Sequence, residues 1–432
     1  MSTDHHHATS HLERLLRTRN QEELLQQLAP NHAQPAAKIK GGADVSADVL
    51  ERRWDLLPAT SRASLLDAQT QAQIESYQHN IENLVGTVKV PVGIAGPLRV
   101  NGLFAQGDYY VPLATTEAAL VASYSRGCQL VSAAGGCTAV LLNEGVSRAP
   151  GFAFRTLQEC GGFIVWVTSQ IEQLRAQAES TTRHGKLSDL RITVEGNHVY
   201  LSFEYTTGDA SGQNMVTLAT EAVCDYIQQH SPVKPQYSFV EANLSGDKKA
   251  SAQSFLLVRG KKVSAEVLLS AELVTTRLHT TAEHMADYWR MSALGGVLSG
   301  TQGVQGHYAN GLAALYLACG QDVACVAESA VGVTRFEATR AGELYASVTL
   351  PNIMVGTVGG GTALPSQRAC LDILGLAGPG KAQMLAEVSA GLVLAGELSI
   401  IGALCSGDFS RAHRMLARAP AAAAKVQGST GG

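Results

Sequence analysis

In the N-terminal segment, which is otherwise polar, apolar residues recur at helical spacing. Intervals of three or four residues place side chains on one face of an α-helix. The residues with this spacing are Leu12, Leu15, Leu16, Leu24, Leu25 and Leu28. A second, more polar helix is predicted from Thr60 to about Asn80. We therefore expect residues 1–81 to form a helical N-terminal region.

Further along, residues 150–240 alternate between short strand patterns and helical patterns. Strands are predicted at FAFRT, LRITV, HVYLSFEY and QYSFVEANL, with a turn at Glu195-Gly196-Asn197. Helices are predicted at Leu157–Glu179 and Ser211–His230. The resulting β-α-β-β-α-β order is that of the ferredoxin-like, or split β-α-β, arrangement. We expect this segment to be a small domain inserted into a larger one.

The larger domain then consists of residues 82–149 and 241–405. A helix is predicted at ATTEAALVASYSRGCQL, a long buried helix at Tyr308–Ser329 and an alanine-rich helix at Gly380–Cys405. Residues 406–432 are expected to form a C-terminal flap and a disordered tail. The predicted fold class is α+β, with a large mixed domain around a long central helix, the inserted ferredoxin-like domain and the helical N-terminal region.

Composition narrows the class of protein. The 432 residues are 45% hydrophobic and 16% charged, with a net charge of −4, which is typical of a globular enzyme and unsuited to nucleic acid or an anionic membrane. The run Ala390–Cys405 is broken by Glu397 and shorter than the roughly 20 residues that a membrane span needs. Eight cysteines without a CxxC pair and a start without a signal peptide's apolar core predict a soluble, cytoplasmic protein with reduced thiols.

Several short motifs almost match known sites but lack a necessary part. GLAGPGKA, Gly375–Ala382, fits a phosphate-binding loop except that it ends in alanine, so it offers no hydroxyl to Mg²⁺. No GxGxxG is present, which argues against a Rossmann domain. His279 and His284 are five residues apart, so a helix turns them away from each other. We expect no metal.

Four polar positions are harder to explain as ordinary surface residues. Asp322 continues the stripe of Leu312, Leu315, Tyr316 and Cys319 on a predicted helix, so its carboxylate is expected to be buried, and buried carboxylates are paired or functional. The other three keep a plain alternative. Glu117 fits a solvated helix start equally well, Lys248 fits a surface charge cluster, and His413 fits an ordinary surface histidine.

Two glycine-bearing loops suggest an anion site. VGTVGGGTALP, Val355–Pro365, is rich in glycine, which usually means that backbone lies close to something. TTGDASGQNMVT, Thr206–Thr217, leads from a strand into a helix, and a helix N-terminus with small residues binds anions. Together with the basic STTRHGK, these loops predict a dinucleotide held outside any Rossmann fold.

Taken together, the motifs resemble one family, the class I hydroxymethylglutaryl-coenzyme A reductases (HMG-CoA reductases). The matching stretches are ENLVG, PVGIAGPL, ATTE, GVSRAP, GDASGQNM, NLSGDKKA, ACGQD, VGTVGGGT, LAGELS and SRAH. They follow the family order from about Glu82 to His413 and so cover most of the chain. Two positions depart from the family pattern, because Gln213 stands where it has Met and Met354 where many relatives have Glu.

The resemblance implies a set of site residues. The catalytic positions correspond to Glu117, Lys248, Asp322 and His413. The substrate contacts correspond to Arg148, Asn243, Arg290 and Asn310. The cofactor contacts correspond to Asp209, Gly212, Asn214, Gly356, Thr357, Gly359, Gly360 and Gly361, with Arg183 facing the 2′-phosphate of NADPH.

The resemblance also implies a reaction and partners. Two NADPH reduce HMG-CoA to mevalonate and free coenzyme A, in the mevalonate and isoprenoid pathway, without a metal. The site is expected to form between the subunits of a homodimer or larger homo-oligomer. Three alternatives stay open: an NADH-dependent enzyme that oxidises mevalonate, a non-catalytic protein that binds coenzyme A thioesters, and a nucleotide hydrolase that uses GLAGPGKA.

Overall fold

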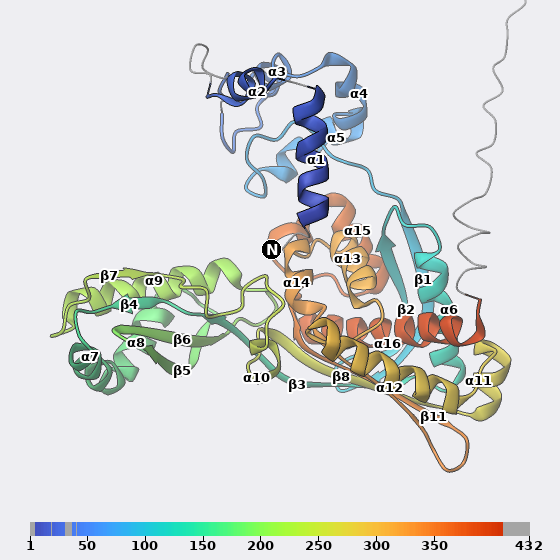
Figure 1. The fold of residues 1–432 in the computed structure, drawn as a ribbon. Helices are drawn as coiled ribbons and strands as arrows, with labels where there is room; N and C mark the ends of the chain where they lie inside the picture. The colour runs from blue at the N-terminus through green and yellow to red at the C-terminus, as the bar shows by residue number, and fades with distance from the viewer. Residues whose placement is uncertain (1–4, 19, 31–36, 40, 409–432) are drawn as a thin grey trace, which may run out of the picture. The chain divides into compact units, whose positions relative to one another are not determined.

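The computed structural model describes residues 5–18, 20–30, 37–39 and 41–408 (Figure 1). Two compact units divide the chain, Met1–Thr87 and Val88–Gly432. Each unit has its own packing and is described by itself below. The predicted division of the chain into four parts stays a prediction.

The first unit is made of helices, and those described after α1 have eight residues or fewer. Its elements are α1 (His5–Thr18), α2 (Gln21–Leu28), α3 (Ala47–Trp54), η1 (Ala59–Ser61), α4 (Arg62–Leu65), α5 (Ala68–Ala72) and η2 (Ile74–Tyr77). The single helix predicted from Thr60 to Asn80 is therefore wrong. Leu66 leaves the helical conformation. The Thr70 N–H then donates to Asp67 Oδ1 at 2.8 Å, so that Asp67 caps the start of a new helix.

A mixed sheet organises the second unit. Its strands are β1 (Val92–Gly102), β2 (Gln106–Ala114), β3 (Cys137–Arg148), β4 (Gly151–Ala153), β5 (Lys186–Glu195), β6 (His198–Thr206), β7 (Tyr237–Phe239), β8 (Gly260–Leu269), β9 (Gly303–Val304), β10 (Gly332–Ala338) and β11 (Leu344–Ile353). The main path runs β7-β4-β6-β3-β8-β11-β10-β9. The pairs β1–β3 and β9–β10 are parallel and the others antiparallel. Figure 1 shows β3 running from the larger part of the sheet to the smaller.

The remaining helices of this unit pack on the sheet or join its strands. They are α6 (Leu120–Ala133), α7 (Leu157–Ser169), α8 (Ile171–Glu179), α9 (Gln213–His230), α10 (Gln253–Leu256), α11 (Ala271–Leu278), α12 (Ala282–Ser299), α13 (Tyr308–Ala318), η3 (Val323–Cys325), α14 (Val326–Ser329), η4 (Gly360–Ala363), α15 (Pro365–Leu374) and α16 (Ala382–Ser406). The fold is thus a mixed α+β fold with a large mixed sheet and a long C-terminal helix.

The core of the second unit surrounds α16. Nineteen of its 25 residues are buried, and α6 approaches so closely that a Cβ at Gly127 would lie 1.8 Å from the carbonyl oxygen of Ala395. By length and composition α16 could cross a membrane. The expectation that the apolar run at Ala390–Cys405 is too short for a membrane span is therefore wrong. However, 83% of its most apolar window is buried inside the protein, and burial in a core also selects for such a composition.

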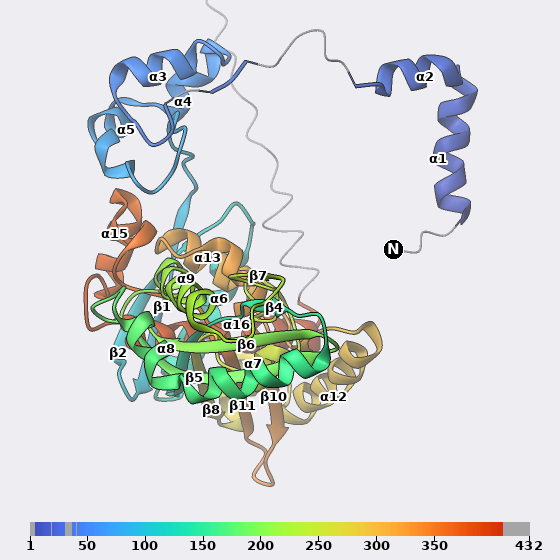
Figure 2. The same ribbon diagram turned by 90° about the vertical axis from the view of Figure 1, so that its left-hand side faces the viewer.

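The segment from β4 to β7 has the element order predicted from the sequence, with one change. Its four strands lie in the order β7-β4-β6-β5 and each neighbouring pair is antiparallel. The helix expected at Leu157–Glu179 is interrupted at Gln170, so that it forms α7 and α8. Figure 2 shows these two helices crossing in front of β5 and β6.

The helix predicted at Tyr308–Ser329 is wrong. α13 ends at Ala318, and Gly320 has a positive φ of 68°. A Cβ there would lie 2.3 Å from the carbonyl oxygen of Gly361, so only glycine allows the turn and the close approach together. The chain then enters η3, with Asp322 as its N-cap. The apolar stripe therefore stops before Asp322, whose side chain is 38% exposed rather than buried.

Candidate active site

The structure pairs two of the four expected catalytic residues. Lys248 Nζ lies 2.8 Å from Asp322 Oδ2, and the two side chains are 41% and 38% exposed. The hydrogen bond that Lys248 donates to Asp322, together with the charge of Asp322, raises the pKa of Lys248. Partial burial would raise the pKa of Asp322, but the hydrogen bond and charge of Lys248 outweigh it and lower that pKa. Both partners are therefore held in their charged forms.

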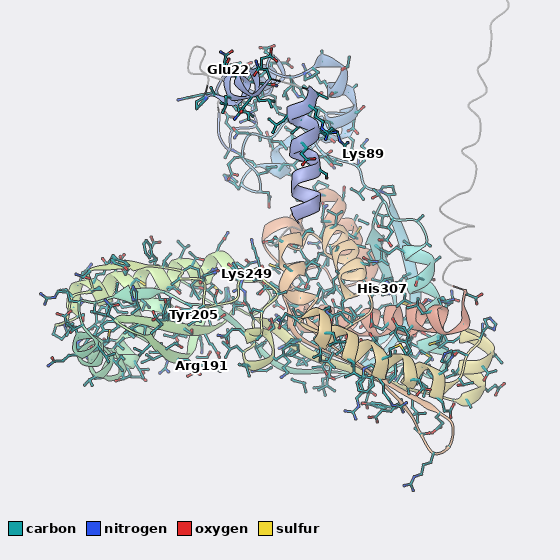
Figure 3. The ribbon with its side chains drawn as sticks, in the orientation of Figure 1. Glu22, Lys89, Arg191, Tyr205, Lys249 and His307 are labelled. Carbon is teal, nitrogen blue, oxygen red and sulfur yellow. The ribbon has the colours of Figure 1, made fainter. Side chains whose placement is uncertain are left out.

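Lys248 sits in a tight turn. Its φ is +55°, and Gly246 two residues earlier has a φ of +75°. The Lys249 N–H donates to the Gly246 carbonyl oxygen at 3.1 Å, and Lys249 Nζ donates to the carbonyl oxygen of Asp247 at 2.8 Å. Lys249 marks this turn in Figure 3. A left-handed conformation is unfavourable for a lysine, so the surroundings must hold it.

A network of buried charges lies directly behind this turn. Arg148, expected to contact substrate, is buried and places Nη1 2.8 Å from Asp247 Oδ2. The other oxygen of Asp247 contacts Arg259 Nη2. Arg259 is 2% exposed, and its Nε lies 2.7 Å from Oε2 of the fully buried Glu328. Arg148 is thus tied to the turn that carries Lys248.

The sequence analysis missed Asp247, Arg259 and Glu328. Asp247 precedes Lys248 in the GDKK motif, so its place in the motif was a usable signal. Arg259 and Glu328 are 69 residues apart in the sequence, and each looks like an ordinary charge in its own stretch. Only the fold brings them together.

Glu117 and Asn310 also meet in the structure. Glu117 lies between β2 and α6, where its N–H donates to Thr115 Oγ1 at 3.0 Å. Asn310, in the first turn of α13, donates from Nδ2 to Glu117 Oε1 at 3.4 Å. Glu117 is exposed, so the burial expected of a proton donor is not provided by the described residues of this chain. Among those residues, no hydrogen bond or ion pair joins Glu117 to Lys248.

A buried glutamate fixes the start of α13. Glu397 of α16 accepts the N–H groups of Gly306 and His307 at 2.7 and 2.8 Å, and the hydroxyl of Thr334 at 2.7 Å. His307, labelled in Figure 3, places Nε2 2.9 Å from the Gly396 carbonyl oxygen. Burial raises the pKa of Glu397, against these hydrogen bonds. The segment that leads to Asn310 is therefore anchored to the core helix.

The glycine loop lies against two other pieces of backbone. A Cβ at Gly356 would lie 2.6 Å from the Ser211 nitrogen, and one at Gly361 would lie 2.7 Å from the Gly320 carbonyl oxygen. The Gly356 N–H donates to Gln321 Oε1 at 2.8 Å. The glycines therefore allow this loop to lie beside both the 209–211 loop and the turn before Asp322.

Asp209, expected to contact the cofactor, holds the backbone together instead. Its carboxylate accepts the N–H groups of Gly380, Lys381 and Ala382 at 2.7, 3.1 and 3.2 Å, at the start of α16. Its own carbonyl oxygen accepts the N–H of Thr357 at 2.8 Å. Thr357 is buried, and its Oγ1 has no hydrogen-bond partner among the described residues.

The other expected cofactor residues differ in how open their surroundings are. Gly359 and Gly360 have positive φ values, are exposed, and would have no atom within 4 Å of an added Cβ. Gly212 is the N-cap of α9 with a φ of 75°, and Asn214 is exposed in the first turn of that helix.

Two further contacts tie the start of α9 to its surroundings. Thr182 Oγ1 lies 2.9 Å from Met215 Sδ, which places the turn bearing the exposed Arg183 against the first turn of α9. Gln213 Nε2 lies 3.4 Å from Asp322 Oδ2 and 3.1 Å from Cys325 Sγ. The start of α9 thus reaches both a basic turn and the Lys248–Asp322 pair.

Three predicted residues make no direct described contact with this cluster, although Asn243 reaches it through Glu241, whose Oε2 lies 3.6 Å from Arg148 Nη1. Arg290, on α12, is 64% exposed and pairs with Asp287 on the same helix. Asn243 is exposed, and its N–H donates to Glu241 Oε1 at 2.7 Å. His413 lies outside the described residues. Within the part of the chain that the structure describes, no group of His, Cys, Asp or Glu could hold a metal ion.

The cluster combines a charged amine, a carboxylate that accepts an amide hydrogen bond, and loops that suit a phosphate-bearing ligand. A fixed cation stabilises an oxygen that gains negative charge, and helix N-termini and open glycine backbone bind phosphates. This arrangement can support reduction of a carbonyl group by a dinucleotide.

Comparisons with known proteins agree with this chemistry. A family model described as Hydroxymethylglutaryl-coenzyme A reductase matches residues 49–418. The 3-hydroxy-3-methylglutaryl-coenzyme A reductase of Pyrococcus horikoshii is 44% identical over 352 residues, 80% of this chain and 85% of that protein. The enzyme of the same name from Aeropyrum pernix is 40% identical over 409 residues, 93% of this chain and 96% of that protein.

Solved structures of more distant proteins share the fold. The class II 3-hydroxy-3-methylglutaryl-CoA reductase from Streptococcus pneumoniae bound to NADPH aligns with a TM-score of 0.63 at 21% identity. The alignment covers 82% of this chain and 96% of that chain. At this level of identity the likeness shows the fold alone.

Proposed function

The chain belongs to the hydroxymethylglutaryl-coenzyme A reductase family, and on that premise we propose that it works with NADPH at the site around Lys248 and Asp322. It is an oxidoreductase of the mevalonate pathway that reduces HMG-CoA to mevalonate. The observation that carries the residue assignment is the 2.8 Å ion pair between Lys248 and Asp322. The neighbouring Gln321 holds the glycine loop next to that pair.

Lys248 is the proposed electrophilic group. Reduction of a thioester to an alcohol takes two hydride transfers, and each places negative charge on a carbonyl oxygen. A cation fixed at that oxygen is often the largest single catalytic factor. Since Asp322 raises the pKa of Lys248, the amine stays charged at neutral pH and can donate to the oxygen in both steps.

Glu117 and His413 are the proposed proton donors. The alkoxide formed by the second hydride needs a proton, and Glu117 would supply it, with the Asn310 amide orienting the carboxylate. Free coenzyme A leaves as a thiolate, and histidine suits its protonation near pH 7. The family model extends to residue 418 and so includes His413.

The chain's own residues fit a phosphate-bearing nicotinamide cofactor, which would supply the hydrides. The exposed Gly359–Gly360 backbone and the N-terminus of α9 suit its phosphates, and the buried Thr357 Oγ1 is still free to accept or donate a hydrogen bond. Arg183 would face the 2′-phosphate that distinguishes NADPH from NADH. Asp209 fits less well, because its carboxylate already accepts three backbone N–H groups. We assign it to positioning the loops.

A second copy of the chain is proposed to complete the site. Glu117, Lys248 and Asp322 are all substantially exposed, although their chemistry calls for a site from which water is excluded. The face of α12 that carries Arg290 also exposes Met291, Leu294, Val297 and Leu298. Such a contiguous apolar surface is typical of a subunit interface. Arg290 would then contact the substrate in the neighbouring subunit's site.

The deciding measurement is the loss of NADPH absorbance with HMG-CoA, repeated with NADH. We expect two cofactors oxidised for each HMG-CoA consumed, with mevalonate and a free thiol as products. Faster reduction of NAD⁺ with mevalonate and coenzyme A would instead favour an NADH-dependent enzyme working in the oxidative direction. Cofactor oxidation that does not depend on HMG-CoA would contradict the assignment.

The Arg183→Ala variant tests the choice of cofactor. A guanidinium can bind a phosphate through two hydrogen bonds, and charge-assisted hydrogen bonds contribute roughly 1.5–3 kcal/mol each. We expect KM for NADPH to rise at least about tenfold, with KM for NADH nearly unchanged. Arg191→Ala is the matched control, because Arg191 (Figure 3) is an exposed arginine of the same segment whose partners are Asp189 and Glu204. Equal losses with both cofactors would contradict a phosphate contact.

A further inference from the structure

Arg259 is a fully buried arginine outside the expected set of site residues. It occupies the position before β8 and is 2% exposed. Its Nε lies 2.7 Å from Glu328 Oε2, its Nη1 donates to the Ser147 carbonyl oxygen at 3.0 Å, and its Nη2 contacts Asp247 Oδ1. Three nitrogens of one rigid guanidinium therefore join β3, α14 and the turn before Lys248.

This contact also fixes the carboxylate of Asp247. One of its oxygens contacts Arg259 and the other lies 2.8 Å from Arg148 Nη1. The charges of Arg259 and Arg148 lower the pKa of Asp247, although burial would raise it. With both oxygens engaged by guanidinium groups, this carboxylate has no freedom to rotate.

The residue that follows Asp247 is Lys248, whose backbone has a φ of +55°. A left-handed conformation costs a lysine free energy and persists only where the surroundings impose it. The hydrogen bonds within the turn join residues 245–249 to one another. Arg259 and Arg148 tie Asp247 to the rest of the fold, and Ser147 Oγ adds a longer hydrogen bond to the Ser245 carbonyl oxygen at 3.4 Å. These contacts together fix the position of the Lys248 backbone.

Stability alone is a poor reason for this buried ion pair. Burying a carboxylate and a guanidinium removes both from water, and replacement by apolar residues of similar size is often neutral or stabilising. The planar Arg259 guanidinium binds two carboxylates at fixed angles, which an apolar pair cannot do. It therefore fixes the Lys248 turn relative to α14.

We propose that Arg259 and Glu328 are positioning residues for Lys248. Glu328 fixes the plane of the Arg259 guanidinium, Arg259 fixes Asp247, and Asp247 sets the left-handed turn from which the Lys248 amine reaches Asp322. This inference rests on the proposed function of Lys248. It adds that the buried pair acts on turnover, through geometry, without contacting substrate.

Arg259→Lys is the principal test. Lysine keeps the positive charge beside Glu328, but a single ammonium cannot reproduce the fork that reaches Glu328 and Asp247 together. We expect kcat with HMG-CoA to fall at least about tenfold, with KM for NADPH within about twofold of wild type and a thermal midpoint close to wild type. An unchanged kcat would overturn the proposal.

A second set of variants separates positioning from stability. Arg259→Met leaves Glu328 without its cation and Glu328→Met leaves Arg259 with Asp247 alone, whereas the double variant removes both charges and leaves Asp247 with Arg148. We expect the double variant to recover most of the thermal midpoint lost by the single variants while its kcat stays low. Recovery of both kcat and midpoint would overturn the proposal. Should the double variant not fold, the Arg259→Lys result decides.

Glu387→Gln is the matched control. Glu387 is as deeply buried as Glu328, but it accepts the N–H groups of Leu103, Phe104, Ala105 and Leu141, outside the site. We expect it to lower the thermal midpoint and leave kcat of the folded protein within about twofold. A fall in kcat equal to that of Arg259→Lys would mean that any buried change has this effect, which would overturn the proposal.

A readout other than activity keeps the inference separate from the proposed function. The pKa of Lys248 can be followed by NMR after ¹³C-dimethylation of lysines, with Lys248→Arg used to assign the signal. We expect the pKa of Lys248 to fall in Arg259→Lys, because the amine moves away from Asp322. If wild type does not reduce HMG-CoA but this shift occurs, the proposed function fails and the positioning remains. An unshifted pKa with wild-type turnover overturns the positioning.

Discussion

Two ion pairs in this molecule have the same chemistry and opposite surroundings. Lys248 and Asp322 are 41% and 38% exposed, whereas Arg259 and Glu328 are 2% and 0% exposed. An exposed pair can receive a substrate oxygen and exchange protons with solvent, but it adds little to stability. A buried pair can do neither, but it holds a fixed geometry. This difference fits the roles proposed above, in which the exposed pair carries out the chemistry and the buried pair sets its position.

The largest effect is expected when the buried pair is broken. Glu328→Met removes the fully buried carboxylate that pairs with Arg259 and leaves the guanidinium with Asp247 alone; breaking a buried pair in this way costs roughly 3–5 kcal/mol of unfolding free energy. Asp322→Asn removes the acidic partner of the exposed pair and should cost less than about 1 kcal/mol. Urea unfolding of both variants measures the difference. Equal losses would show that burial does not distinguish the two pairs.

Removal of the exposed amine should have the opposite balance of effects, with a large fall in turnover and little change in stability. Lys248→Ala takes away the cation proposed at the reacting oxygen, so we expect kcat to fall by about 10²–10³, with unfolding free energy changed by less than about 1 kcal/mol. Lys262→Ala, on β8 and outside the site, is the control and should keep wild-type turnover. Near-normal turnover of Lys248→Ala would remove the basis of the proposed mechanism.

The pH dependence tests how the exposed pair is charged. Asp322 raises the pKa of Lys248, so Asp322→Asn should lower that pKa and move the basic limb of the kcat profile to lower pH. We expect kcat at pH 7 to fall roughly tenfold, as for the loss of one charge-assisted hydrogen bond. A basic limb at the wild-type position would assign it to another group.

The same shifts fix the sign of any effect on stability. Because the pKa of Asp322 is lowered, its contribution is present above its unfolded pKa and fades as pH falls through the folded value. Because the pKa of Lys248 is raised, its contribution is present below its unfolded pKa and fades as pH rises through the folded value. The difference in unfolding free energy between wild type and Asp322→Asn should therefore be largest at pH values between the pKa of Asp322 and the pKa of Lys248.

Much of the fold could be predicted from the local pattern of apolar, polar and turn residues in the sequence. The β4-to-β7 segment has the predicted element order, because its strands alternate and its turn at Gly196 is signalled in the sequence. The long helix at Tyr308–Ser329 was wrong because its interruption depends on a contact between Gly320 and Gly361. A helical period carries no information about such a tertiary contact.

The candidate site was predictable only in part. Ordered motifs gave Lys248 and Asp322, which the structure pairs, and Glu117 and Asn310, which it also brings together. Burial of Asp322 was wrongly expected because it was inferred from a stripe that ends before it. The pairing of Arg259 with Glu328 has no local signal, since each depends on a partner far away in the sequence.

The smallest effect is expected at Gln213, where the family pattern has methionine. Its Nε2 lies 3.4 Å from Asp322 Oδ2, and this hydrogen bond contributes to lowering the pKa of Asp322, after the larger effect of Lys248. Gln213→Met should therefore raise the pKa of Asp322, which ¹³C NMR of labelled aspartate can follow. We expect kcat to fall about two- to fivefold, the range of one ordinary hydrogen bond.

Gln383→Met is the control for this substitution. Gln383 Nε2 donates to Glu144 Oε1 at 3.2 Å, so the same exchange removes a glutamine–carboxylate hydrogen bond outside the site, and kcat should not change. If Gln213→Met leaves both kcat and the pKa of Asp322 at their wild-type values, the glutamine does not act on the exposed pair. If instead the pKa of Asp322 rises while kcat is unchanged, Lys248 alone is enough to keep Asp322 ionised without the Gln213 hydrogen bond.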